Sequence, residues 1–292
     1  MTSDIVENRR IGLAAAFGVL FVWSGFYVVS RAGLLSPLKG TDIVALRILV
    51  AGAITLPFAW RWWPRHISFW KAMLLAATGP AVLYSLIFYA GLRQTSVAFA
   101  GVFANGSLPI FTVLIVGLVL GAWPGRVRFA AISVIVLGTV VVGSSGMRTG
   151  NAAVSGIIFF LAASALLSVY TFFVRHWGIT PKQALAVLNV PSALIFLPVW
   201  LTFLPSGISE TPVTMILLQA AYQGLGPGIL AVILYALAAR HLGPTATSGF
   251  SAAVPATATV LAIPFVGEVP ELLDWFGIAL VTIGLFVMVY RS

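Results

Sequence analysis

Asn105 and Ser251 are polar residues in the middle of long apolar stretches, where they could hold part of a small molecule. Each precedes a proline by one turn, Pro109 and Pro255 respectively. An amide or hydroxyl at membrane depth is costly unless it faces a cavity or another helix, and a proline there frees a backbone carbonyl. We expect Asn105 and Ser251 to bind the polar end of a ligand. Close packing of small residues between helices is the alternative explanation.

These two stretches are copies of one another. They are offset by 146 residues, half of the 292-residue chain, and Pro109 falls on Pro255 and Gly121 on Gly267 without gaps. Matching proline and glycine at helix-breaking points indicates an internal repeat. We expect Pro109 and Pro255, and the similarly placed Pro80 and Pro227, to act as hinges or gates.

A second polar group is predicted on the stretch 212–238. Tyr222 and Gln223 share a helix face with Gln219 and lie roughly half-way through a bilayer at about 1.5 Å per residue. Amides and a phenol facing lipid would be expensive, so we expect Tyr222 and Gln223 to line a cavity. Tyr84 is expected at a similar depth, with a hydrogen bond between helices as the alternative.

Aromatic and hydroxyl side chains in two other stretches complete the predicted binding site. Trp23 and Tyr27 are one turn apart in the first apolar stretch, where they could stack on a planar substrate or pack in the core. Ser168 is the remaining predicted binding residue, although a serine in a helix often bonds its own backbone.

Arg47 is the charge that falls inside an apolar stretch, within two turns of its start. We expect it to extend to the membrane surface, toward Asp42. Binding a carboxylate or gating is the other possibility.

The composition requires a membrane protein. Hydrophobic residues make up 60% and charged residues 8%, the mean hydropathy is +1.07, and the net charge of +9 is scattered, so we expect no nucleic-acid partner. Cysteine is absent and the three histidines are far apart, so we expect no metal and no cofactor. The predicted spans are about 11–30, 42–60, 71–92, 96–120, 128–146, 153–174, 182–203, 212–238, 244–266 and 274–290.

The predicted fold is an all-α integral membrane protein with ten transmembrane helices in two inverted five-helix repeats, residues 1–147 and 148–292. An odd number of helices per half reverses the second half relative to the first. With the N-terminus inside, four Lys/Arg residues lie outside: Arg31, Lys39, Arg93 and Arg148. Eleven lie inside: Arg9, Arg10, Arg61, Arg65, Lys71, Arg126, Arg128, Arg175, Lys182, Arg240 and Arg291. This asymmetry predicts that both termini are cytoplasmic.

Several short motifs resemble the EamA-type drug/metabolite transporter superfamily. They are Trp23-Ser24-Gly25, Val28-Val29-Ser30-Arg31, Leu46-Arg47 and the closing pattern Pro255…Gly267-Glu268…Gly277…Gly284. Within that superfamily the chain is similar to bacterial aromatic amino-acid exporters of the YddG type. The resemblance implies a cavity between the two halves and export of amino acids or related metabolites. The first half departs from the closing pattern, because Gly121 is followed by Ala122 rather than by Glu.

The substrate class follows from what the middles of the spans lack. They hold no Asp or Glu, unlike small multidrug exporters, and no Lys or Arg for a phosphate. A neutral or zwitterionic, largely apolar substrate fits best, and an enzyme would need a reactive group that these spans do not hold. We therefore expect a monomeric exporter of amino acids, aromatic ones first, in the bacterial inner membrane, whose partners are the small-molecule substrate and the lipid bilayer. Efflux of other amphipathic metabolites or drugs is the alternative.

Overall fold

A computed structural model describes residues 2–150 and 154–290, and every regular element in these ranges is helical. Residue 153, the expected start of the sixth span, and Arg291, counted in the charge asymmetry, lie outside the described residues. The elements are α1 (Thr2–Leu35), α2 (Gly40–Thr55), η1 (Leu56–Phe58), α3 (Ala59–Trp62), α4 (Phe69–Thr78), α5 (Val82–Arg93), α6 (Val97–Ala100), η2 (Gly101–Gly106), α7 (Leu108–Leu120), α8 (Arg126–Thr149), α9 (Val154–His176), α10 (Pro181–Phe203), η3 (Ile208–Glu210), α11 (Val213–Leu225), η4 (Gly226–Leu230), α12 (Ala231–Leu242), α13 (Pro244–Ala252), α14 (Val254–Val266) and α15 (Leu272–Tyr290).

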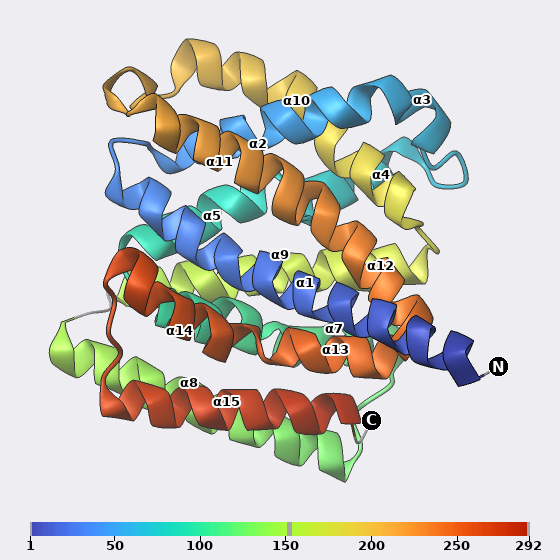
Figure 1. Ribbon diagram of the computed structural model, residues 1–292, viewed down its shortest axis with the longest axis vertical. Helices are drawn as coiled ribbons and strands as arrows, with labels where there is room; N and C mark the ends of the chain where they lie inside the picture. Colours follow the sequence, from blue (N-terminus) through green and yellow to red (C-terminus); the bar gives the residue numbers. More distant parts are fainter. Residues whose placement is uncertain (1, 151–153, 291–292) are drawn as a thin grey trace.

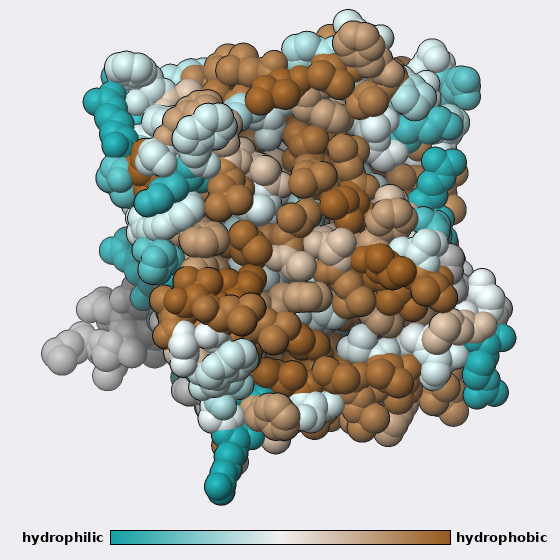
Figure 2. Space-filling view, turned by 180° about the vertical axis from the view of Figure 1, so that it is seen from behind, coloured by the Kyte–Doolittle hydropathy of each residue, from teal (hydrophilic) through white to brown (hydrophobic). Residues whose placement is uncertain are grey.

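The predicted membrane fold is confirmed. In the described residues nine helical stretches are long and apolar enough to cross a membrane, and the bent pair α13–α14 makes a tenth. The helices run side by side across Figure 1, and the beginning of α1 and the end of α15 lie on the same side of the bundle. We call this the terminal side and the opposite one the far side. Figure 2 shows a broad hydrophobic band between two hydrophilic edges, as a membrane-spanning surface requires.

The two halves pack in the same way. The helix pair α4–α5 of the first half packs against α9 of the second half. Equivalently, the pair α11–α12 of the second half packs against α1 of the first half. Equivalent spans also meet directly: α2 packs on α10, and α8 on α15, which lie together along one edge of the bundle in Figure 1. Five spans per half make the second copy inverted relative to the first.

Glycine allows the closest contacts between these spans. A methyl group placed on Gly138 of α8 would come within 2.7 Å of the Gly277 carbonyl oxygen of α15, and one on Gly277 within 2.8 Å of the Gly138 carbonyl oxygen. Such small residues let helix backbones approach each other in a membrane, where lipid provides no hydrophobic drive for association. The boundary expected between residues 147 and 148 falls in the last turn of α8.

Candidate functional site

Four spans are interrupted near their middles, and each interruption holds one of the four predicted hinge prolines. Pro80 lies between α4 and α5, and Pro227 lies in the π-helical turn η4 between α11 and α12. Pro109 follows the π-helical turn η2, and Pro255 begins α14 after a 43° bend. Proline lacks the N–H that the preceding turn needs, so the regular hydrogen-bond ladder stops at each position. The broken spans are the third and fourth of one half and their equivalents in the other.

Asn105 and Ser251 meet where two broken spans cross. The Asn105 Nδ2 donates a 3.5 Å hydrogen bond to the Ser251 carbonyl oxygen, whose helical donor would be residue 255, a proline. Nearby, a methyl group on Gly101 would come within 3.1 Å of the Pro255 Cα. The two bonded residues are 146 positions apart, which is the offset of the repeat. Equivalent positions of the two halves therefore touch each other, as they do at a pseudo-two-fold axis.

Tyr27 and Tyr84 both pack against one buried ring, that of Phe88. The Phe88 centroid lies 5.5 Å from that of Tyr27 and 5.9 Å from that of Tyr84. Both tyrosines retain 6% of their surface, whereas Phe88 has none. The structure therefore brings these two predicted residues together, between α1 and α5. Trp23 lies elsewhere along α1, 5.7 Å from the ring of Tyr235.

Gln223 of α11 is hydrogen-bonded to α1 through Ser30. Its Nε2 donates to the Ser30 Oγ at 3.0 Å and to the Gln219 Oε1 at 3.3 Å, and Gln219 in turn donates to the Val29 carbonyl at 2.7 Å. Both glutamines are fully buried, and among the described residues the Gln223 Oε1 has no hydrogen-bond partner. An amide pair thus fastens α11 to α1 and leaves one acceptor unused.

Tyr222 and Ser168 lie between helices. The Tyr222 hydroxyl donates to the Val22 carbonyl at 3.0 Å, and its ring occupies the space beside Gly25. The Ser168 hydroxyl is fully buried and donates to the Leu108 carbonyl at 3.1 Å, which links α9 to the broken fourth span. Among the described residues, no hydrogen bond or ring contact joins Tyr222 or Ser168 to the Tyr27–Tyr84 pair.

The expectation that Arg47 extends to the membrane surface is wrong. Its side chain is 7% exposed and turns inward, with Nη1 3.5 Å from the Ser85 Oγ and the guanidinium carbon 6.0 Å from the centroid of Phe26. Asp42, its expected partner, instead accepts bonds of 2.8, 2.8 and 2.9 Å from the Lys39 N–H, the Gly207 N–H and the Trp200 indole. Those three donors satisfy the carboxylate at the start of α2, so it has no need of the arginine.

An ion pair on the far side connects the halves, and sequence reasoning missed it. The Arg31 Nε donates to Glu268 at 2.6 Å, Arg31 also donates to the Leu92 carbonyl at 2.9 Å, and Glu268 accepts the Val97 N–H at 2.7 Å. The pair borders a hollow of about 390 Å³ that also holds Arg93. The signal was the acid after Gly267, which the first half lacks, but a partner 237 residues away was not predictable.

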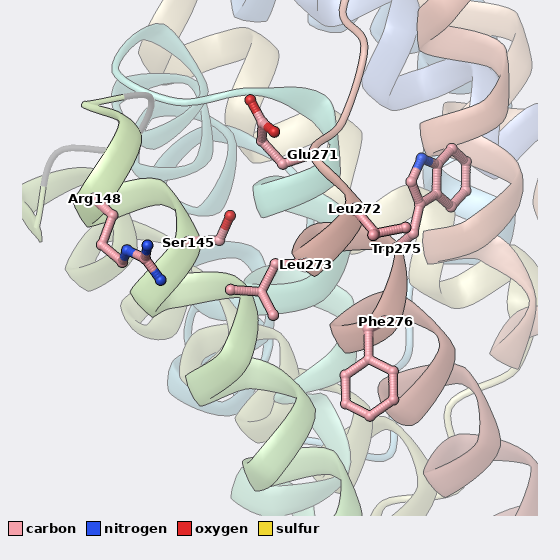
Figure 3. Close-up of a pocket in the computed structure, with 7 residues that line it drawn as sticks. All are labelled: Ser145, Arg148, Glu271, Leu272, Leu273, Trp275 and Phe276. Atoms are coloured by element: carbon pink, nitrogen blue, oxygen red, sulfur yellow. The ribbon is translucent and has the colours of Figure 1, made fainter.

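Another hollow lies at the edge of the bundle. It has a volume of about 910 Å³, and Figure 3 shows Arg148 of α8 and Glu271, just before α15, on different sides of it. Leu272 and Phe276 in its wall are 86% and 59% exposed. None of the predicted binding residues lines it, so it is a surface groove at the membrane edge rather than the predicted site. No group of three metal-ligating side chains occurs in 2–150 or 154–290.

Comparisons with known proteins agree with this architecture. Residues 10–144 and 154–290 each match the EamA-like transporter family. A Bacillus subtilis (strain 168) protein described as the uncharacterized transporter YwfM is 28% identical over 269 residues, covering 87% of this chain and 86% of the relative. A solved structure described only as a crystal structure of protein has a TM-score of 0.63 and 20% identity and covers 98% of both chains, which supports the fold alone.

Proposed function

The chain belongs to the EamA-like transporter family, and on that basis we propose that it exports amino acids, aromatic ones foremost, through a site between its two halves. As a member of this family it is a multi-pass membrane transporter and not an enzyme. We further propose that it lies in a bacterial inner membrane with both termini in the cytoplasm, as the eleven-to-four charge asymmetry favours.

The contact between Asn105 and Ser251 carries this proposal. It lies where the broken fourth span of one half crosses the broken ninth span of the other. In transporters built from inverted repeats, substrates bind near such breaks because the backbone there presents free polar groups. The 3.5 Å separation of these groups is long for a hydrogen bond, so exchange for substrate contacts would cost little.

The chemistry of the lining supports an amino acid. Tyr27 and Tyr84 offer ring faces for an aromatic side chain, and Asn105 and Gln223 offer neutral polar groups for the backbone end. The described acidic side chains from Asp42 onward lie near helix ends. A substrate that carries a net positive charge would therefore find no counter-ion in the middle of the spans.

We propose alternating access as the mechanism. Pro80, Pro109, Pro227 and Pro255 lie at the interruptions of four spans, where a change in bend angle breaks the fewest hydrogen bonds. The inverted halves exchange roles when the site opens to one side and then to the other. Among the described residues no buried acid lies at mid-span to carry a proton, so flux down the substrate gradient is sufficient.

The test is transport by purified protein in liposomes. Labelled phenylalanine, tyrosine and tryptophan should enter faster than into protein-free liposomes. Asn105→Leu keeps the volume but removes a donor and an acceptor, and should lower the apparent affinity about tenfold or more. Val113→Ala, on the same span toward the helix end, is the matched control and should transport normally. Wild-type transport by a well-folded Asn105→Leu variant would contradict the proposed site. Flux of other amphipathic metabolites but of no amino acid would favour the alternative substrate class.

A further inference from the structure

Arg47 is a buried cation without an anion. Its side chain is 7% exposed within the span Gly40–Trp62, about 10 Å from the far-side start of α2. Among the described residues no carboxylate oxygen lies within 4.0 Å of it, and its polar neighbours are neutral hydroxyls, the Ser85 Oγ at 3.5 Å and the Tyr89 phenol. The guanidinium has five N–H donors, more than two hydroxyl acceptors can satisfy.

The surroundings of Arg47 are polar but uncharged. The phenols of Tyr84 and Tyr89 on α5 lie near Arg47, and the Phe26 ring lies beside it. The Tyr89 hydroxyl lies beside both Arg47 and the Ser30 hydroxyl, which in turn accepts the Gln223 Nε2 at 3.0 Å, and the Gln223 Oε1 has no hydrogen-bond partner in the described chain. Arg47, Tyr89, Ser30 and Gln223 are thus successive neighbours where α2, α5, α1 and α11 meet.

Energetics argue against a purely structural role. Burying a charge is costly unless it is paired and hydrogen-bonded, and an ionisable side chain inside a membrane almost always has a partner. Phe26 at 6.0 Å provides at most a weak cation–π contact. The side chains around Arg47 are themselves buried, with Ser85 at 0%, Tyr89 at 1% and Tyr84 at 6%, so its charge is largely shielded from water.

We propose that Arg47 binds the carboxylate of the transported substrate. This inference rests on the proposed function and adds a charged residue to the proposed site. The guanidinium forms a bidentate ion pair with the carboxylate, and Tyr84 and Tyr27 pack against the ring of the substrate. The unused Gln223 Oε1 is the acceptor for the ammonium group. A single arginine among neutral groups suits a monocarboxylate, because a phosphate dianion would need further cations.

The experiment measures ligand protection of purified protein against thermal unfolding, with three probes that share a phenyl ring. L-Phenylalanine has both charged groups, 3-phenylpropionate only the carboxylate, and phenethylamine only the ammonium. In Arg47→Gln the apparent affinity for the two carboxylates should fall by at least about tenfold, while that for phenethylamine should not fall. Arg47→Lys keeps the charge but not the planar fork, so it should lose affinity partially. Arg93→Gln removes an exposed arginine at the end of α5 and should bind all probes normally.

A second readout separates binding from folding. No ion pair is lost in Arg47→Gln, so the ligand-free variant should unfold at or above the wild-type temperature. A variant that no longer folds, or an equal loss of all three probes, would assign Arg47 to the scaffold and overturn the inference. Unchanged affinity for 3-phenylpropionate, or no binding of it by the wild type, would overturn it as well.

Liposome flux distinguishes the two proposals. If 3-phenylpropionate binds in an Arg47-dependent way but no amino acid is transported, the carboxylate site stands and the proposed substrate fails. If amino acids are transported equally by the wild type and Arg47→Gln, the proposed function stands and the proposed role of Arg47 in binding the carboxylate is refuted.

Discussion

Replacing Glu268 with glutamine should loosen the contact that ties the two halves together on the far side. Glu268 accepts the Arg31 Nε at 2.6 Å and the Val97 N–H at 2.7 Å, and so joins α1, the start of α6 and the loop after α14. Under alternating access, a contact between the halves on one side forms when that side is closed. Glutamine keeps the shape and one acceptor but removes the charge.

The expected magnitude follows from the geometry. A hydrogen bond to a charged group contributes about 1.5–3 kcal/mol, and the lower part of that range applies because the side chains of Arg31 and Glu268 are 19% and 18% exposed. A loss of about 2 kcal/mol corresponds to a roughly 30-fold shift of the equilibrium toward the state that is open on the far side.

The chain contains no cysteine, so one introduced thiol can report this opening. Thr259 is fully buried and lines the 390 Å³ hollow beside the ion pair, and Thr259→Cys nearly preserves its volume. A membrane-impermeant thiol reagent should label Thr259→Cys slowly, and up to roughly 30-fold faster when Glu268→Gln is added. Glu271→Gln, which removes an exposed acid nearby, should leave the rate unchanged. Equal labelling with and without Glu268→Gln would refute the reasoning.

Four further outcomes are expected. A reporter enzyme that works only in the periplasm, fused after Ser292, should be inactive, and strong activity would reverse the proposed orientation. Liposomes loaded with substrate but without an ion gradient should still show flux, whereas flux only with a proton gradient would reveal an unrecognised proton carrier. Tyr84→Leu should slow phenylalanine more than alanine, since it removes the ring stacked near Phe88; an equal loss would place the side chain of the substrate elsewhere. Asp42→Asn should lower the free energy of unfolding by about 2 kcal/mol in denaturant titrations, because Asp42 is buried and bonded by three N–H groups, with the exposed Glu210→Gln as the unaffected control.

Local chemistry explains which features were predictable. The apolar runs between charged residues gave the spans to within a few residues, because each helix must satisfy its own backbone inside the bilayer. Pro109 and Pro255 marked their interruptions in the same way, since a missing N–H acts within one turn of its own position.

Arg47 shows where such reasoning ends. The side chain of a charged residue near the end of a span can extend to the membrane surface or turn inward, and the sequence is compatible with both orientations. Which one occurs depends on Phe26, Ser85 and Tyr89, which come from other helices, and on Asp42 being satisfied already by Trp200 and Gly207.

The sequence alone therefore determined the membrane class, the ten spans and the positions of the breaks, all of which depend on residues close together along the chain. Only the tertiary structure decided which polar groups meet. The Arg31–Glu268 pair joins residues 237 positions apart, and the Gln223–Ser30 bond joins residues 193 apart. The physical reason is that a transmembrane helix forms from its own hydrogen bonds, whereas its rotation about its axis is set by the packing of its neighbours, and that rotation decides which side chains face each other.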